Sequence, residues 1–259
     1  MAANSQIQTD LLASRSTGSR GLSFSETDAS QRGGTWSYLK WTDKEVAAIE
    51  TILKNASITC NLSKGYEATE EAFKSIGIGI PSPTVLHIAT HGYFFPDVKS
   101  GANTPSSEAG KGEAAFKTSE HPMIRSGLLL AGANHAWQTG QPLHPDLEDG
   151  ILTAYEISQM NLQNTELVVL SACETGLGDI QGNEGVYGLQ RAFKIAGAKY
   201  LVMSLWQVPD QETSVFMTQF YRHWLEDKMT IPDAFRAAQK EMRERFINPY
   251  QWAGFVLVE

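Results

Sequence analysis

The chain has 259 residues, of which 42% are hydrophobic and 19% are charged, so it fits one large α/β domain or two small ones of an ordinary globular protein. Its formal net charge is -8 and no run of Lys and Arg offsets this charge, which argues against direct binding of nucleic acid. No apolar stretch is long enough to span a membrane and the N-terminus lacks a secretory signal, while two cysteines make no disulfide framework, so we expect a reducing, cytoplasmic setting.

The first 35 residues are rich in Ser, Thr, Gly and Arg, a composition that predicts an irregular N-terminal segment or linker. Packing is expected to begin at Trp36, so we assign residues 36–259 to one domain. Thr42 is a candidate N-cap, with Glu45 as its capping-box partner, and the residues after it repeat at helical spacing. A short strand at residues 58–62 and a helix at 68–76 should follow.

Two stretches share one design, an apolar strand that ends in a small residue, a reactive residue and a glycine. The first is TVLHIATHG at residues 84–92, and the second is ELVVLSACETG at residues 166–176. The unbroken apolar run in the second is typical of a strand buried on both faces of a parallel sheet. If the two strands are parallel neighbours, His91 and Cys173 meet at one edge of the sheet, where ligands bind in open α/β sheets.

The rest of the chain alternates between polar loops and apolar segments, which predicts an α/β fold with a parallel or mixed sheet covered on both faces. The polar segment at residues 96–122 is expected to be a mobile loop beside the mouth of the site. The other expected elements are a strand at 126–131, a loop at 132–149, helices at 151–160 and 186–196, a strand at 200–205, two further helices, and a strand or extended segment at 252–258.

Cys173 and His91 together suggest nucleophilic catalysis, because a histidine can take the proton of a cysteine thiol and stabilise the thiolate. The backbone N–H groups of Cys173 and Gly92 are candidate donors to the oxyanion that forms when an amide is attacked. No Asn or Asp is evident as an orienting partner for His91, although a backbone carbonyl could serve. Taken singly, Cys173 would more often be an inert core residue and His91 a turn or cap residue, so it is the pair that favours function.

Other polar residues carry weaker signals. His87 is more often a packing histidine with a satisfied hydrogen bond, and Cys60 is expected in the core. The remaining histidines lack the spacing of metal ligands, so we expect no metal. The glycine-rich residues 176–185 lack the Lys-Ser/Thr of a phosphate loop, so no cofactor is expected either.

At HIATHG (residues 87–92) and SACETG (residues 171–176) the sequence resembles the CHAT domains, caspase-like clan CD cysteine peptidases that are often attached to TPR repeats. Residues 126–134, 184–210 and 252–259 also resemble that family. The resemblance implies an α/β caspase-like three-layer sandwich, with a central, mostly parallel sheet flanked by helices. It also implies that His91 and Cys173 form a catalytic dyad and that Gly92 helps to form the oxyanion hole.

The function implied by this resemblance is that of a regulated, bacterial cysteine endopeptidase that cleaves a protein partner. A regulatory protein or a TPR-containing region is a further implied partner. One alternative is a catalytically weak caspase-like module for interaction or signalling, because such folds also serve as scaffolds. A weaker alternative is a cysteine hydrolase that acts on small amides or esters.

The resemblance to clan CD peptidases implies a specificity pocket beside the nucleophile, built partly by the strand after the cysteine strand, and acidic residues occur in that region. Asp210 follows the strand at residues 200–205, and Glu174, Asp179 and Glu184 lie in the loop after the cysteine. No arginine occurs in either segment before Arg191, whereas a pocket for Asp would need cations. We therefore expect a preference for Arg or Lys over Asp before the cut, with Asp210 as the leading pocket residue. The alternative is that Asp210 caps a helix that begins near Gln211.

Overall fold

The computed structural model describes residues 35–95, 119, 121–171, 173–174, 184–206 and 208–259, and for residues 173, 174 and 184–186 it describes the backbone alone. The expectations for residues 1–34, for most of the loop at 96–122 and for Asp179 lie outside this part of the chain.

The central sheet contains four strands in the order β1-β5-β7-β8. They are β1 (Val85–Ile88), β5 (Leu167–Leu170), β7 (Tyr200–Ser204) and β8 (Phe255–Val258). The first three run parallel and β8 is antiparallel, so the sheet is mostly parallel. All four residues of β5 are buried, as its unbroken apolar run predicts.

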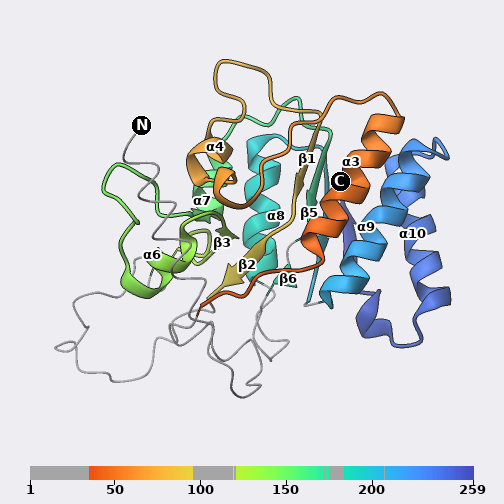
Figure 1. Cartoon of the computed structure of the whole chain (residues 1–259). Helices are drawn as coiled ribbons and strands as arrows, with labels where there is room; N and C mark the ends of the chain where they lie inside the picture. The colour runs from red at the N-terminus through yellow and green to blue at the C-terminus, as the bar shows by residue number, and fades with distance from the viewer. Residues whose placement is uncertain (1–34, 96–118, 120, 172, 175–183, 207) are drawn as a thin grey trace.

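Helices cover both faces of this sheet (Figure 1). Val168 and Leu170 of β5 pack into one core with α4, α7 and α8, and Leu167 and Val169 pack into a second core with α3, α9 and α10. This alternation follows from the two-residue period of a strand. The bounds are α3 (Thr42–Asn55), α4 (Glu70–Lys74), α7 (Ala154–Ser158), α8 (Glu184–Ala196), α9 (Asp210–Leu225) and α10 (Ile231–Arg245), with short 3-10 helices at η1 (Gly65–Glu67) and η2 (Pro249–Gln251). The expected α/β architecture is confirmed at this level.

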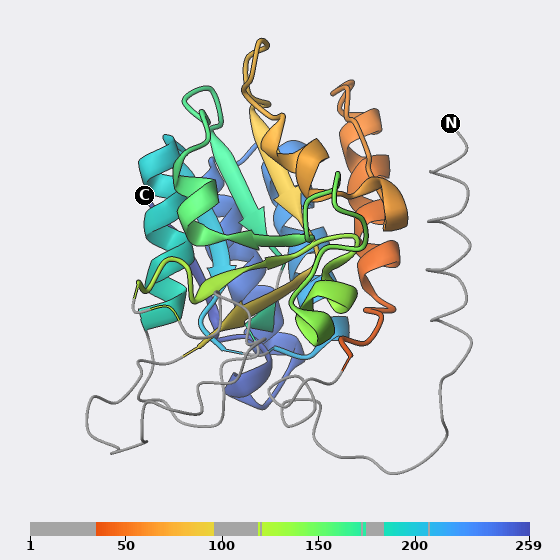
Figure 2. The same cartoon turned by 90° about the vertical axis from the view of Figure 1, so that its left-hand side faces the viewer.

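A second sheet, with the strand order β4-β3-β2-β6, runs across the direction of β1 and β5 (Figure 2). Its strands are β2 (His91–Phe94), β3 (Ser126–Leu129), β4 (Ile151–Thr153) and β6 (Cys173–Glu174). The chain passes from β1 into β2 and from β5 into β6, so two neighbours in the central sheet pair again in the second sheet. We expected His91 and Cys173 to lie in turns that follow β1 and β5. Instead, His91 begins β2 and Cys173 begins β6. Helix α6 (Ala133–Thr139) packs beside this sheet through Trp137.

Three local expectations are wrong. Residues 58–62 form no strand, and α6 lies within the expected loop at 132–149. The segment at 151–160 begins as strand β4, because Gly150 turns the chain with a φ of 79° and Ile151 then pairs with Leu129. A capping box of Thr153 and Glu156 starts α7 only after that strand.

The expected capping box at Thr42 is also wrong. Thr42 is the first residue of α3, and Trp41 occupies the N-cap position without a side-chain bond. Glu45 turns inward instead and is 1% exposed. By contrast, Gly197 ends α8 as expected, with a φ of 109° that favours glycine.

A partly buried ionic cluster joins α4 to α7, and Glu70 is its buried member. The Nζ atom of Lys74 lies 3.1 Å from Oε1 of Glu70, 2.9 Å from Oε1 of Glu148 and 2.9 Å from Oε1 of Glu156. We call Glu70, Lys74, Glu148 and Glu156 the Lys74 cluster. The backbone N–H of Gly150 also donates to Oε2 of Glu70, at 2.9 Å. Since the ammonium lies among the three carboxylates, the cluster holds its own cation.

The Lys74 cluster predicts a pH-dependent stability. Burial, together with repulsion from Glu156, raises the pKa of Glu70 from its ordinary 4.5 to about 7. The folded protein then keeps a proton that the unfolded chain releases, so the stability contributed by Glu70 is full below pH 4.5 and is lost as the pH rises to about 7. Glu70→Gln lacks this titration. Its free energy of unfolding relative to wild type should rise between pH 5 and pH 8 in urea denaturation.

Glu67→Gln is the matched control, because Glu67 is exposed and lies three residues before Glu70 in the sequence. The difference in the free energy of unfolding between Glu67→Gln and wild type should be the same at pH 5 and pH 8. An equally constant difference for Glu70→Gln would contradict the prediction.

Candidate active site

His91 begins β2 with its side chain half-buried. Its Nε2 atom lies 2.7 Å from the carbonyl oxygen of Ser37, and its ring centroid lies 5.0 Å from that of Trp36. A carbonyl oxygen can only accept a hydrogen bond, so Nε2 carries a proton and donates it. In the neutral imidazole, Nδ1 is then the basic nitrogen. The Ser37 carbonyl is thus the orienting group that the sequence could not identify.

Cys173 lies beside His91 on the neighbouring strand. β2 and β6 are parallel, with His91 opposite Cys173 and Gly92 opposite Glu174. Neighbouring strands are about 4.8 Å apart, so the two backbones are adjacent. Just before these strands, a hydrogen bond also joins the two segments of the chain. The N–H of Ser171 donates to the carbonyl of Ile88 at 2.9 Å. The predicted meeting of the two positions is confirmed for the backbone.

Residues 35–41, which we call the N-terminal strap, are held against His91 at two ends. The side chain of Asn134 accepts from the N–H of Trp36 at 2.8 Å and donates to its carbonyl at 3.2 Å. The Trp36 ring also meets Trp137 edge-on, with centroids 5.2 Å apart. At the far end, the N–H of Trp41 donates to Oδ2 of Asp210 at 2.9 Å. The strap was not predicted, because its partners are 54 to 169 residues away in the sequence.

The comparison with protein families agrees with these motifs, since the model of the CHAT domain matches residues 1–259. The chain belongs to the CHAT family. The match includes residues 1–35, for which an irregular N-terminal segment or linker stays a prediction.

Two curated relatives of this CHAT chain are named Tetratricopeptide repeat protein 28, from Mus musculus and Homo sapiens. Each is 26% identical over 221 residues, which is 84% of this chain. The aligned part makes up 9% of the mouse protein and 8% of the human one, so the chain spans less than a tenth of their length.

The acidic residues proposed for the specificity pocket lie at different places in this CHAT domain. Asp210 is the first residue of α9, whose N-cap is Pro209, and its carboxylate accepts a hydrogen bond from the Trp41 N–H of the strap. The alternative that Asp210 is the N-cap residue is therefore wrong, because Pro209 occupies that position. The backbone of Glu174 pairs with that of Gly92 in the second sheet, and Glu184 begins α8. Gly92 itself is buried.

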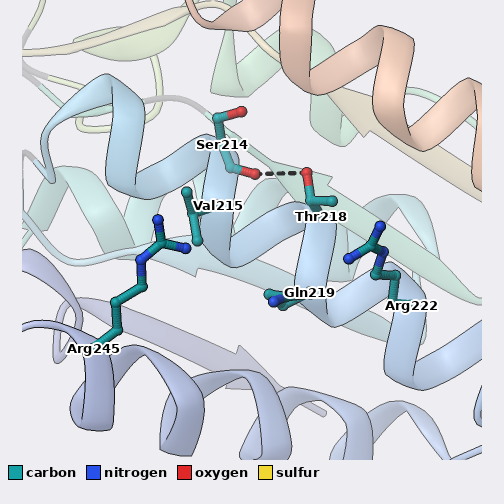
Figure 3. A pocket seen from close by; sticks show the side chains of 6 residues that line it. All are labelled: Ser214, Val215, Thr218, Gln219, Arg222 and Arg245. Carbon is teal, nitrogen blue, oxygen red and sulfur yellow. Dashed lines mark hydrogen bonds between the residues drawn. The ribbon is translucent and has the colours of Figure 1, made fainter.

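This CHAT domain has a hollow at the surface of α9 and α10 (Figure 3). It is lined by residues of α9 and by Arg245 of α10, and Arg222 and Arg245 stand on different sides of it. Thr218 donates a hydrogen bond of 2.8 Å to the carbonyl of Ser214 along its wall. Because the residues that line it lie on α9 and α10, we do not assign it to the candidate site. The lining residues are Ser214, Val215, Thr218, Gln219, Arg222 and Arg245.

Among the helices in the described ranges, none has the length and apolar character needed to cross a membrane.

Proposed function

We propose that this chain is a caspase-like cysteine endopeptidase that cleaves a protein partner, with Cys173 as nucleophile and His91 as base. The observation that carries the proposal is the register of β2 and β6, which sets His91 opposite Cys173. The hydrogen bond from Nε2 of His91 to the Ser37 carbonyl supports it, because it leaves Nδ1 as the basic nitrogen. The proposed setting is a bacterial cytoplasm, although the two relatives named above are mammalian.

In the proposed reaction, Nδ1 of His91 takes the thiol proton of Cys173, and the thiolate attacks the carbonyl carbon of the scissile amide. The backbone N–H groups of Cys173 and Gly92 stabilise the resulting oxyanion. The carbon–nitrogen bond then breaks, and the imidazolium returns the proton to the leaving amine. Water hydrolyses the thioester by the same proton transfers, which releases the acid and restores the thiol. The Ser37 carbonyl stabilises the imidazolium through its bond to Nε2–H.

The test is mass-spectrometric mapping of the cut sites in a peptide library. The wild type should cut at a restricted set of sequences, and Cys173→Ala should cut at none of them. Cys60→Ala is the matched control, because Cys60 is the other cysteine of the chain and should leave the pattern unchanged. Cuts that persist in Cys173→Ala would contradict the proposal.

The alternative is a catalytically weak module for interaction or signalling, in which a TPR-containing region or a regulatory protein is the partner. The names of the two relatives favour this context, since both are tetratricopeptide repeat proteins. The library separates the two functions. A wild type whose cuts equal those of Cys173→Ala would favour the module.

The proposed peptidase should prefer Arg or Lys before the cut. An acidic pocket pairs with a cationic side chain but leaves an Asp side chain desolvated beside like charge, so we expect kcat/KM to be about 100-fold higher for Arg and Lys than for Asp. Matched Arg, Lys, Asp and Leu substrates measure this ratio. Faster cleavage after Asp or Leu would contradict the preference.

Asp210→Asn tests whether Asp210 supplies the pocket charge. The amide oxygen of Asn can still accept from the Trp41 N–H, so the strap stays in place while the charge is removed. The preference for Arg and Lys should then fall. An unchanged preference would move the pocket charge to another residue.

A further inference from the structure

A buried polar triad lies behind the candidate site. Glu45 of α3 is 1% exposed, and its Oε1 atom lies 2.9 Å from Nε2 of His87 in β1. Nδ1 of His87 lies 3.2 Å from the hydroxyl of Tyr221 in α9, and the two rings meet edge-on. The triad thus joins a helix, a strand and a second helix across one face of the central sheet.

The cost of burying a carboxylate makes this contact specific. An unpaired carboxylate in a protein interior is destabilising by several kcal/mol, whereas one that is paired and hydrogen-bonded is tolerated. Helix α3 therefore cannot rotate or slide along β1 without separating Glu45 from His87. Tyr221 can accept or donate, so it satisfies His87 in either protonation state. Burial and the charge of Glu45 also raise the pKa of Tyr221, which keeps its hydroxyl protonated.

The same two chain segments touch a second time at His91. The segment of residues 37–45 contributes the Ser37 carbonyl and the Glu45 carboxylate, and the segment of residues 87–91 contributes a histidine to each of them. Between the two contacts, the N–H of Glu45 donates to the carbonyl of Trp41 at 2.8 Å as α3 begins. A shift of the first turn of α3 would therefore move the strap and its carbonyl relative to His91.

We infer that Glu45 is a positioning residue, which through His87 fixes the first turn of α3 and so holds the Ser37 carbonyl against Nε2 of His91. This role rests on the proposed function, in which His91 is the base. The local sequence pattern pointed to a different task for Glu45, the capping of its own helix. Its inward orientation gives the residue a partner 42 positions away instead.

The experiment compares variants that keep the volume of the side chain. Glu45→Gln keeps an oxygen that can accept from His87, and Glu45→Met removes it. The double variant Glu45→Met with His87→Leu replaces the pair by apolar groups, a change that usually preserves or increases stability. Glu50→Ala is the matched control, because Glu50 lies on α3 and bonds Lys54 rather than β1.

Two measurements are made on each variant. The first is the NMR signal of the Nε2 proton of His91 in histidine-labelled protein, assigned by its loss in His91→Gln. A hydrogen bond to the Ser37 carbonyl slows its exchange with water. The second is kcat and KM for a peptide that the wild type cleaves.

Glu45→Met and the double variant should stay folded, exchange the His91 proton at least about 10-fold faster, and lose about 10-fold or more in kcat with little change in KM. Glu45→Gln should keep the exchange rate of the His91 proton and the kcat close to those of wild type. Glu50→Ala should match wild type in both. A protected His91 proton and full kcat in the double variant would overturn the inference, as would equal losses in Glu50→Ala. If wild type cleaves no peptide, the proposed function fails, while proton exchange at His91 still tests the positioning role.

Discussion

Cys173→Ala and His91→Ala are each expected to abolish peptide cleavage while the protein stays folded. The first removes the only atom that attacks the substrate in the proposed reaction. The second removes the group that takes and returns the proton, and general acid–base catalysis alone contributes about 10²- to 10⁴-fold in rate. Single-turnover cleavage of a peptide taken from the library measures the loss, and circular dichroism reports the fold.

Because Cys173 and His91 act as a unit, the variant that carries both Cys173→Ala and His91→Ala should cleave no more slowly than either single variant. Cys60→Ala again serves as the control, and its rate should equal that of wild type. Near-wild-type cleavage by either single variant would show that the dyad assignment is wrong.

The second large effect is expected for Lys74→Met. This change removes the ammonium from the Lys74 cluster and leaves Glu70, Glu148 and Glu156 facing one another without it. Removing one partner of a fully buried ionic group costs about 3–5 kcal/mol. We expect about 2 kcal/mol here, because Lys74 and Glu156 are partly exposed and Glu148 is exposed. Urea denaturation at pH 8 measures the loss in the free energy of unfolding.

Two further variants identify the cause. Lys54→Met removes an exposed ion pair of the same i,i+4 spacing, and its stability should stay close to wild type. Adding Glu70→Gln to Lys74→Met should recover part of the lost stability, because one buried charge is removed. If the double variant is as unstable as Lys74→Met at pH 8, repulsion among the carboxylates is not the cause.

The central sheet could be predicted from the sequence because its signals are local. The apolar run of β5 marks a strand buried on both faces, and the helical spacing that ends at Gly197 marks α8. Of the second sheet, only β3 was predicted, as the strand expected at residues 126–131. Strands β6 and β4 could not be predicted, because they have two and three residues, too few to establish a period. Glu45 was misassigned for a related reason: a local capping pattern was present, but a partner in β1 determines its orientation.

The candidate site was partly predictable. Two parallel strands that end in matching motifs predict the meeting of His91 and Cys173, and their backbone register confirms it. The strap was beyond prediction, since nothing near Trp36 or Ser37 in the sequence indicates His91 as a partner. Asp210 shows the same limit, because its position at the start of a helix suggested a cap while its carboxylate holds Trp41.

The most direct test of the account is the rate at which each cysteine is alkylated by iodoacetamide at pH 6, followed by peptide mass spectrometry. Cys60 is an internal reference within the same molecule. If His91 takes the proton of Cys173, that thiol should react at least about 10-fold faster than Cys60, because the thiolate is the reactive form. His91→Ala should abolish the difference and leave the rate at Cys60 unchanged. Equal rates at the two cysteines, or a fast Cys173 that persists in His91→Ala, would contradict the pairing of Cys173 with His91.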